Sequence, residues 1–110
     1  MSFPSLPKIE IPQSSPNPHG VTIQLGHFDT LEVIVPPITI VPPFGFITVS
    51  VIVDGKPAQE AWVEPGDSAP VSIDIPPYAL RCCWQTIEYL VTTVNGTEYS
   101  ETLRVLNDGV

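Results

Sequence analysis

From residue 21 onward, hydrophobic and polar residues alternate in short segments that are separated by turn residues. Alternation with a period of two places the two sets of side chains on opposite faces of a β-strand. The clearest case is residues 70–75, where three β-branched residues alternate with Ser72 and Asp74. Segments that recur at roughly ten-residue spacing are typical of a sandwich or barrel. We therefore expect an all-β fold with about seven antiparallel strands.

The boundaries of these strands follow from the turn residues. Asp54-Gly55 and Asn95-Gly96 are dipeptides typical of tight hairpins, and each lies between two segments of alternating residues. Residues 76–84 connect two strands and have room for one helical turn. The expected strands are residues 21–27, 31–35 (which either end there or resume at 38–41 after two prolines), 46–53, 58–64, 70–75, 85–94 and 97–106.

The first twenty residues have a different composition. Prolines recur there every two to five residues, with Ser, Asn and Gln between them. Such a composition favours extended, polyproline-like conformations. We therefore divide the chain into a proline-rich extended arm at residues 1–20 and a β-sandwich domain at residues 21–110. The apolar side chains of the arm, which we expect to bind a partner protein, are Phe3, Leu6, Ile9 and Ile11.

Charge and hydropathy narrow the range of partners. Twelve acidic residues against four basic ones give a net charge of -8, which repels phosphate backbones and anionic lipid surfaces. The sequence has no apolar run long enough for a membrane-spanning helix, and its first residues do not form a signal peptide. We expect neither nucleic acid nor a membrane as a partner, and we expect synthesis in the cytoplasm without a signal peptide.

The sequence offers little for catalysis or for binding metals and cofactors. His27 with Asp29 is the nearest approach to a catalytic pair, and His19 lies in the arm. Cys82 and Cys83 are adjacent, which disfavours a disulfide between them and supplies too few ligands for zinc. Acidic residues near loops lack the spacing of a calcium loop, so we interpret them as solubilising charge. We predict no catalytic, cofactor-binding or metal-binding residues, and therefore no enzyme.

Three aromatic residues are candidates for a surface contact. If Ala61 and Val63 face the core, Trp62 faces solvent, while Tyr78 and Trp84 lie in the connection over residues 76–84. Exposed tryptophans on a soluble domain often mark contacts. The alternative is structural: Trp62 covers an edge of the sheet, or Trp84 closes the end of the sandwich.

The second half of the chain resembles immunoglobulin-like or fibronectin type III-like sandwiches. The succession VSIDIPPYAL, QTIEYLVTTV, NG and TEYSETLRV is similar to the E, F and G strands of such domains in phage virion accessory (decoration or tail-associated) proteins and bacterial surface proteins. The chain departs from antibody domains, because Val91 stands where their second cysteine would be. The resemblance implies a fold and says little about a ligand.

These observations predict a non-enzymatic structural or interaction module. We expect a virion decoration, cement or tail-associated subunit that docks on neighbouring subunits through its arm, as a homo-oligomer or lattice within the virion. The alternative is a carbohydrate-binding or adhesion module excised from a larger secreted protein, located outside the cell or at its surface. In that case Trp62, Tyr78 and Trp84 would stack on a sugar.

Overall fold

The structure is a computed structural model that describes residues 6–26, 29–38, 45–64, 69–81, 83–94 and 96–108. Within these ranges the chain forms strands and one short 3-10 helix, so the predicted all-β fold is confirmed. The described residues include no helix that could cross a membrane. The elements are β1 (Ser15–Asn17), β2 (Gly20–Ile23), β3 (Leu31–Val35), β4 (Ile47–Val53), β5 (Lys56–Val63), β6 (Val71–Ile75), η1 (Pro77–Ala79), β7 (Cys83–Thr93), β8 (Gly96–Tyr99) and β9 (Leu103–Asn107).

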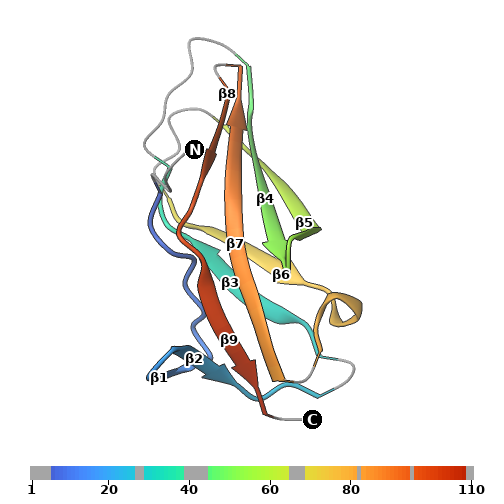
Figure 1. Cartoon of the computed structure of the whole chain (residues 1–110). Coiled ribbons are helices and arrows are strands. Elements are labelled where there is room, and N and C mark those ends of the chain that lie inside the picture. The colour runs from blue at the N-terminus through green and yellow to red at the C-terminus, as the bar shows by residue number, and fades with distance from the viewer. Residues whose placement is uncertain are drawn as a thin grey trace.

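The strands form two sheets (Figure 1). The larger sheet has the order β1-β2-β9-β7-β4-β5, with β8 also paired to β7, and the smaller one pairs β3 with β6. All of these pairs are antiparallel except β2 with β9, which is parallel. Nine strands therefore lie within the described ranges, compared with the seven expected, because β1 was not predicted and the last predicted strand is divided into β8 and β9.

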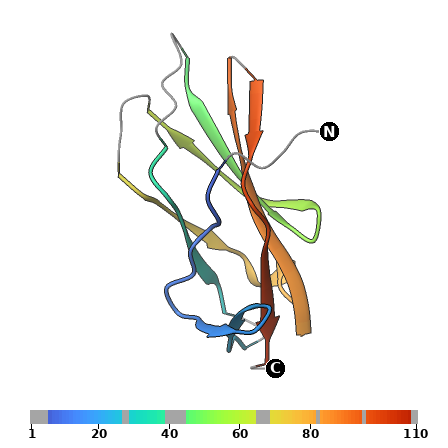
Figure 2. The same cartoon turned by 60° about the vertical axis from the view of Figure 1, so that its left-hand side comes forward.

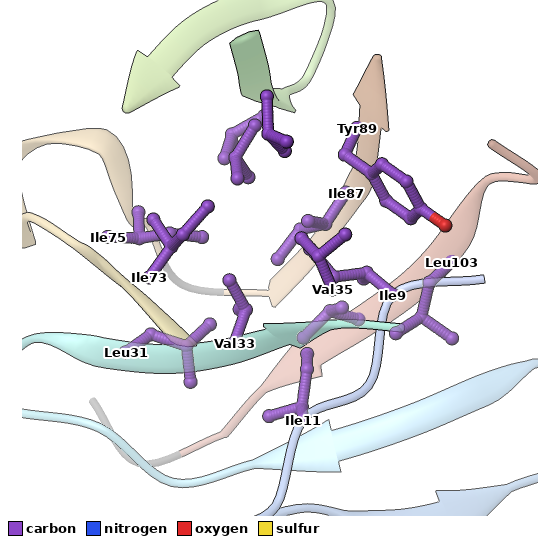
Figure 3. Packing of buried hydrophobic residues seen from close by; sticks show 14 of the residues in the cluster. Ile9, Ile11, Leu31, Val33, Val35, Ile73, Ile75, Ile87, Tyr89 and Leu103 are labelled. Atoms are coloured by element: carbon purple, nitrogen blue, oxygen red, sulfur yellow. The ribbon is translucent and has the colours of Figure 1, made fainter. Parts of the chain in front are cut away.

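The core lies between the two sheets and is built mainly from the inward faces of β3, β4, β6, β7 and β9. In β4 the inward residues are Ile47, Val49, Val51 and Val53, all buried. In β3 they are Leu31, Val33 and Val35, which lie in the same hydrophobic cluster (Figure 3). Removing such side chains from water is the main favourable contribution to folding, at about 1.5–3 kcal/mol for each one that is fully buried.

The β4–β5 hairpin turns at the predicted dipeptide. Asp54 has a φ of 51° and Gly55 a φ of 81°. Two successive positive φ values are what a tight two-residue hairpin requires, and Asp and Gly tolerate them. The pairing register shifts between Val51 and Ile52, so a bulge lies close to the turn.

The break between β8 and β9 occurs at Ser100. The backbone N–H of Ser100 donates to the carbonyl of Tyr89, and the Ser100 hydroxyl accepts from the Tyr89 N–H, both at 2.9 Å. The residues on either side of Ser100 turn to another partner: the N–H of Leu6 donates to the Tyr99 carbonyl at 3.2 Å, and the N–H of Glu101 donates to the Leu6 carbonyl at 3.1 Å. The N-terminal segment is thus attached to the larger sheet where its last strand is interrupted.

The same segment also joins the smaller sheet. Glu10 and Ile34 form an isolated antiparallel bridge, which places residues 6–11 along the gap between the sheets (Figure 2). The side chains of Ile9 and Ile11 are 2% and 7% exposed and belong to the hydrophobic core (Figure 3). The structure therefore shows no separate arm over residues 6–20, since Ile9 and Ile11 alternate with exposed Lys8 and Glu10 as in any half-buried strand.

Candidate interaction surface

The outward face of the larger sheet presents a row of side chains from neighbouring strands. Strand register places Trp62 opposite Thr48, Thr48 opposite Thr92, and Thr92 opposite Thr97, so that one residue from each of four neighbouring strands lies in a row. Inward-facing Val49 and Val91 alternate with this row and are buried. The row is uncharged and faces away from the core.

Two exposed aromatic rings lie at the β5 edge of this face. Phe46 and Trp62 are 59% and 68% exposed, and their ring centroids are 5.5 Å apart with an interplanar angle of 55°. Phe46 lies two residues before Thr48, so strand alternation puts it on the same face as Trp62. The two rings are in contact with each other, and most of the surface of each ring remains exposed to solvent.

Further exposed apolar side chains extend this region. Tyr99 on β8 faces the same way as Thr97, and Val94 follows the outward-facing Thr92 by two residues. With strands about 4.8 Å apart, β8 lies roughly 14 Å from β5. That distance is within the span of one protein contact area. We call this set the aromatic patch, and its members are Phe46, Trp62, Val94 and Tyr99.

Trp84 lies on the same face but far from the aromatic patch. It is eight residues from Thr92 along β7, or roughly 26 Å at about 3.3 Å per residue. The guanidinium of Arg104 sits 5.2 Å from its ring centre, and the ring of His19 meets it edge-on at 6.1 Å. Trp84 therefore has neighbours within its own chain that cover part of it, in keeping with the structural alternative for this residue.

Tyr78 occupies a third location. It lies on η1 and is 84% exposed. Beside it, an open hollow of about 310 Å³ is formed by η1, the β4–β5 turn and the start of β7. The three aromatic residues predicted as surface contacts are therefore all exposed, but they are not brought together.

Asp54 lines this hollow and binds several of its neighbours. Its carboxylate accepts hydrogen bonds from the Thr86 N–H at 2.9 Å and the Gln85 amide at 3.1 Å, and it forms an ion pair with Arg81. Desolvation by burial alone would raise the pKa of Asp54, but these hydrogen bonds and the charge of Arg81 outweigh it and hold the pKa below its ordinary value. The side chain is therefore a fixed anion that ties the turn to β7.

The apolar residues predicted to bind a partner through the arm divide into three cases. Ile9 and Ile11 are core residues of their own chain, so in this conformation their side chains do not reach a neighbouring subunit. Leu6 is half-buried and packs against the same core. Phe3 lies outside the described residues.

The residues considered for catalysis and metal binding do not converge either. His27 and Cys82 lie outside the described ranges, while Asp29 accepts a hydrogen bond from the Gly26 N–H at 2.8 Å. Cys83 opens β7 with a φ of 74°. In the part of the chain that the structure describes, no three His, Cys, Asp or Glu side chains form a group that could hold a metal ion.

Phe46, Tyr99 and the hollow were not predicted as candidates from the sequence. Phe46 and Trp62 could have been linked, since both fall at outward positions of the two strands joined by the Asp54-Gly55 hairpin. The hollow had no comparable signal, because it forms only when η1 packs beside the β4–β5 turn.

Comparisons with known proteins add no relative. No family model matches the chain, and no curated protein and no solved structure matches it significantly. A proposal about function must therefore come from the residues of the chain itself.

Proposed function

We propose that this chain is a non-enzymatic interaction module, an immunoglobulin-like subunit of a larger protein assembly, with a virion decoration, cement or tail-associated protein as the specific case. The observation that carries the proposal is the exposed Phe46–Trp62 pair on the outward face of the larger sheet. Large aromatic side chains that remain in water on a regular surface are the residues that most often dominate protein contacts.

The strand order supports the immunoglobulin-like part of the proposal. Such domains pair strands B and E in one sheet and strands G, F and C in the other, and variable-type domains add C′ beside C. Here β3 pairs with β6, while β9, β7, β4 and β5 follow one another in the larger sheet. An extended N-terminal segment that is bridged to both sheets, as residues 6–11 are, is compatible with this plan.

The aromatic patch suits contacts with further copies of the same chain. A protein with a net charge of -8 is repelled by its copies wherever acidic groups would meet. The row formed by Trp62, Thr48, Thr92 and Thr97 carries no charge, so a contact centred on this row avoids the cost, whereas Glu60 on the same face lies at its edge. Depletion of charge and enrichment in aromatic residues are the features of interface centres. We therefore assign the contact to this face in place of Ile9 and Ile11.

Sedimentation velocity over a range of concentrations tests this assignment. The full chain is expected to associate reversibly, and Trp62→Thr is expected to weaken the association by at least about 30-fold, as for an interface residue worth about 2 kcal/mol. Trp84→Thr is the matched control, because it removes another exposed tryptophan from the same face about 26 Å away. Threonine keeps the β-propensity of both strands.

A third variant separates this contact from one made by the N-terminus. Deleting residues 1–5 removes Phe3 and leaves residues 6–11 in place. Loss of association in this variant, with Trp62→Thr unaffected, would place the contact at the N-terminus and overturn our assignment to the sheet face. A full chain that stays monomeric at about millimolar concentration would contradict the contact between copies.

The alternative of a sugar platform built from Trp62, Tyr78 and Trp84 is not favoured. Trp62 and Trp84 lie at opposite ends of one face, and Tyr78 lies on η1. A stacking platform needs rings that contact successive parts of one ligand. These three rings are too widely separated to do so for a short sugar chain.

A further inference from the structure

The hollow between η1 and the β4–β5 turn is a second feature that the assembly function does not use. Its volume of about 310 Å³ lies at the lower end of the range for small-molecule sites, about 300–1,000 Å³. Apolar Pro57 and Ala58 on β5 and Ala79 on η1 line part of it. Such a mixed lining can contact both an apolar ring face and a charged group.

Two cations face this hollow. Lys56 and Arg81 line it, and they are two of the four basic residues in the whole chain. The side-chain ammonium of Lys56 has no hydrogen-bond or ion-pair partner among the described residues. Arg81 uses one nitrogen for Asp54, and a guanidinium carries five N–H donors, so most of its donors remain available.

The arrangement around Arg81 favours an anion. Asp54 holds the guanidinium in place and offsets one of the two positive charges, which leaves the hollow with a net positive charge on a protein whose total is -8. Its carboxylate is already occupied by Thr86, Gln85 and Arg81. The remaining donors therefore face a space in which a carboxylate could replace water.

Tyr78 supplies an aromatic ring beside the two cations of the hollow. Its ring lines the hollow and is 84% exposed, with no ring contact to another residue among those described. An aromatic face that is open to solvent beside polar donors is suited to stack on the apolar face of a sugar ring.

We propose that this hollow binds a monosaccharide unit that carries a carboxylate, a hexuronic acid residue. The sugar ring stacks on Tyr78, and its carboxylate accepts hydrogen bonds from Lys56 and Arg81, which are strengthened by charge. The small volume admits one such unit. The acidic surface elsewhere repels a long polyanion, so an isolated acidic residue on an otherwise neutral glycan fits best.

The test is a titration of the isotopically labelled full chain, followed by amide NMR shifts. Sodium glucuronate is expected to shift the amides of residues 54–56, Ala58 and residues 78–81 with a Kd of about a millimolar. Glucose lacks the carboxylate and sodium acetate lacks the ring, so each is expected to bind at least about tenfold more weakly than glucuronate, which corresponds to about 1.4 kcal/mol.

Two variants test the assigned roles. Tyr78→Ala and Lys56→Gln are each expected to weaken glucuronate binding at least fivefold, and both change exposed side chains that the fold does not need. Tyr99→Ala and Lys8→Gln are the matched controls, because they remove an exposed tyrosine and an exposed lysine away from the hollow. Glucuronate binding by Trp62→Thr should equal that of the unmodified chain, so this test is independent of the assembly proposal.

Two results would overturn the proposal. The absence of amide shifts up to about 50 mM glucuronate would show that the hollow has no useful affinity for this class of ligand. Equal binding of acetate and glucuronate, unaffected by Tyr78→Ala, would show ordinary ion pairing with surface cations.

Discussion

Glu10 and Ile34 exchange two backbone hydrogen bonds: the Glu10 N–H donates to the Ile34 carbonyl at 2.9 Å, and the Ile34 N–H donates to the Glu10 carbonyl at 2.7 Å. Ile34 is the fourth of the five residues of β3, and its backbone N–H and carbonyl both point toward Glu10. Without Glu10, this pair of polar groups would lose its protein partners next to a buried core. The N-terminal segment therefore completes the smaller sheet at this point.

The N-terminal segment is expected to contribute to the stability of the fold, because Ile9 and Ile11 lie in the core. Ile9→Ala is expected to lower the free energy of unfolding by about 2–4 kcal/mol, because it leaves a cavity beside Val35 and Leu103 in the core. Chemical denaturation followed by tryptophan fluorescence measures the change. Lys8→Ala in the same segment is the control and should change stability by less than about 0.5 kcal/mol. A fully stable Ile9→Ala variant would mean that the segment is not packed in the core.

The local features of the fold were predictable from sequence. The Asp54-Gly55 dipeptide predicted a hairpin between two strands, and the alternation of Val71, Ile73 and Ile75 predicted β6; the structure contains both. These features depend on φ preferences and on period-two burial, which act over a few residues. For the same reason the outward orientation of Trp62 followed from the inward orientation of Val63.

The role of the N-terminal segment was not predictable in this way. Proline density indicated an extended conformation, which is correct locally, but the partners of Leu6 and Glu10 lie about ninety and twenty-four residues further along the chain. The parallel pairing of β2 with β9 is another long-range contact, and no turn residue in the sequence predicts it. Ser100 divides the last strand because its hydroxyl replaces a ladder contact to Tyr89, and a serine alone does not signal this.

The candidate sites were predictable only in part. Exposure of Trp62, Tyr78 and Trp84 was anticipated, but their positions relative to one another depend on strand register. The pairing of Trp62 with Phe46 needs the β4–β5 register, and the neighbours of Trp84 come from β9 and the β1–β2 turn. The hollow likewise needs Lys56 and Arg81, which are twenty-five positions apart in the sequence, to line the same space.

The Asp54 network predicts a dependence of stability on acidic pH. Because the pKa of Asp54 is lower in the folded chain than its ordinary value of 3.8, its ionised form stabilises the fold above about pH 4, and this contribution is lost as the pH falls through the folded pKa. Asp54→Asn is expected to lower stability at pH 7 by about 1–2 kcal/mol while keeping the turn, since Asn tolerates a positive φ. Urea unfolding from pH 7 to pH 2.5 measures both effects.

The outcome at low pH decides between charge and shape. The difference between Asp54→Asn and the unmodified chain should shrink as the pH falls below 3.8 and through the lower folded pKa of Asp54, because both then carry an uncharged side chain at this position. Asp74→Asn on β6 is the control and should show no comparable effect. A difference that stays constant across the whole pH range would contradict a role for the charge.

Tyr89 predicts a second dependence, at alkaline pH. Burial in the core raises the pKa of Tyr89 to about 12, above the ordinary value of 10. The neutral phenol therefore stabilises the fold fully below pH 10, and this contribution falls as the pH rises toward 12, by on the order of 2–3 kcal/mol. Tyr89→Phe should remove this part of the alkaline loss. Unfolding curves that stay parallel for the two proteins from pH 9 to pH 12 would contradict the burial of the phenol.

Residues 6–11 form an extended segment of this domain that is bridged to both sheets, and for this reason we propose the sheet face, and not this segment, as the contact with neighbours. The most direct measurement is amide hydrogen exchange at Ile34, whose N–H has Glu10 as its partner. We predict that Ile34 exchanges as slowly as the buried amides of β7, because its opening requires release of a segment that buries Ile9 and Ile11. Exchange of Ile34 at a rate close to that of an unfolded chain, while β7 stays protected, would show that the segment is released and free to bind a neighbouring subunit.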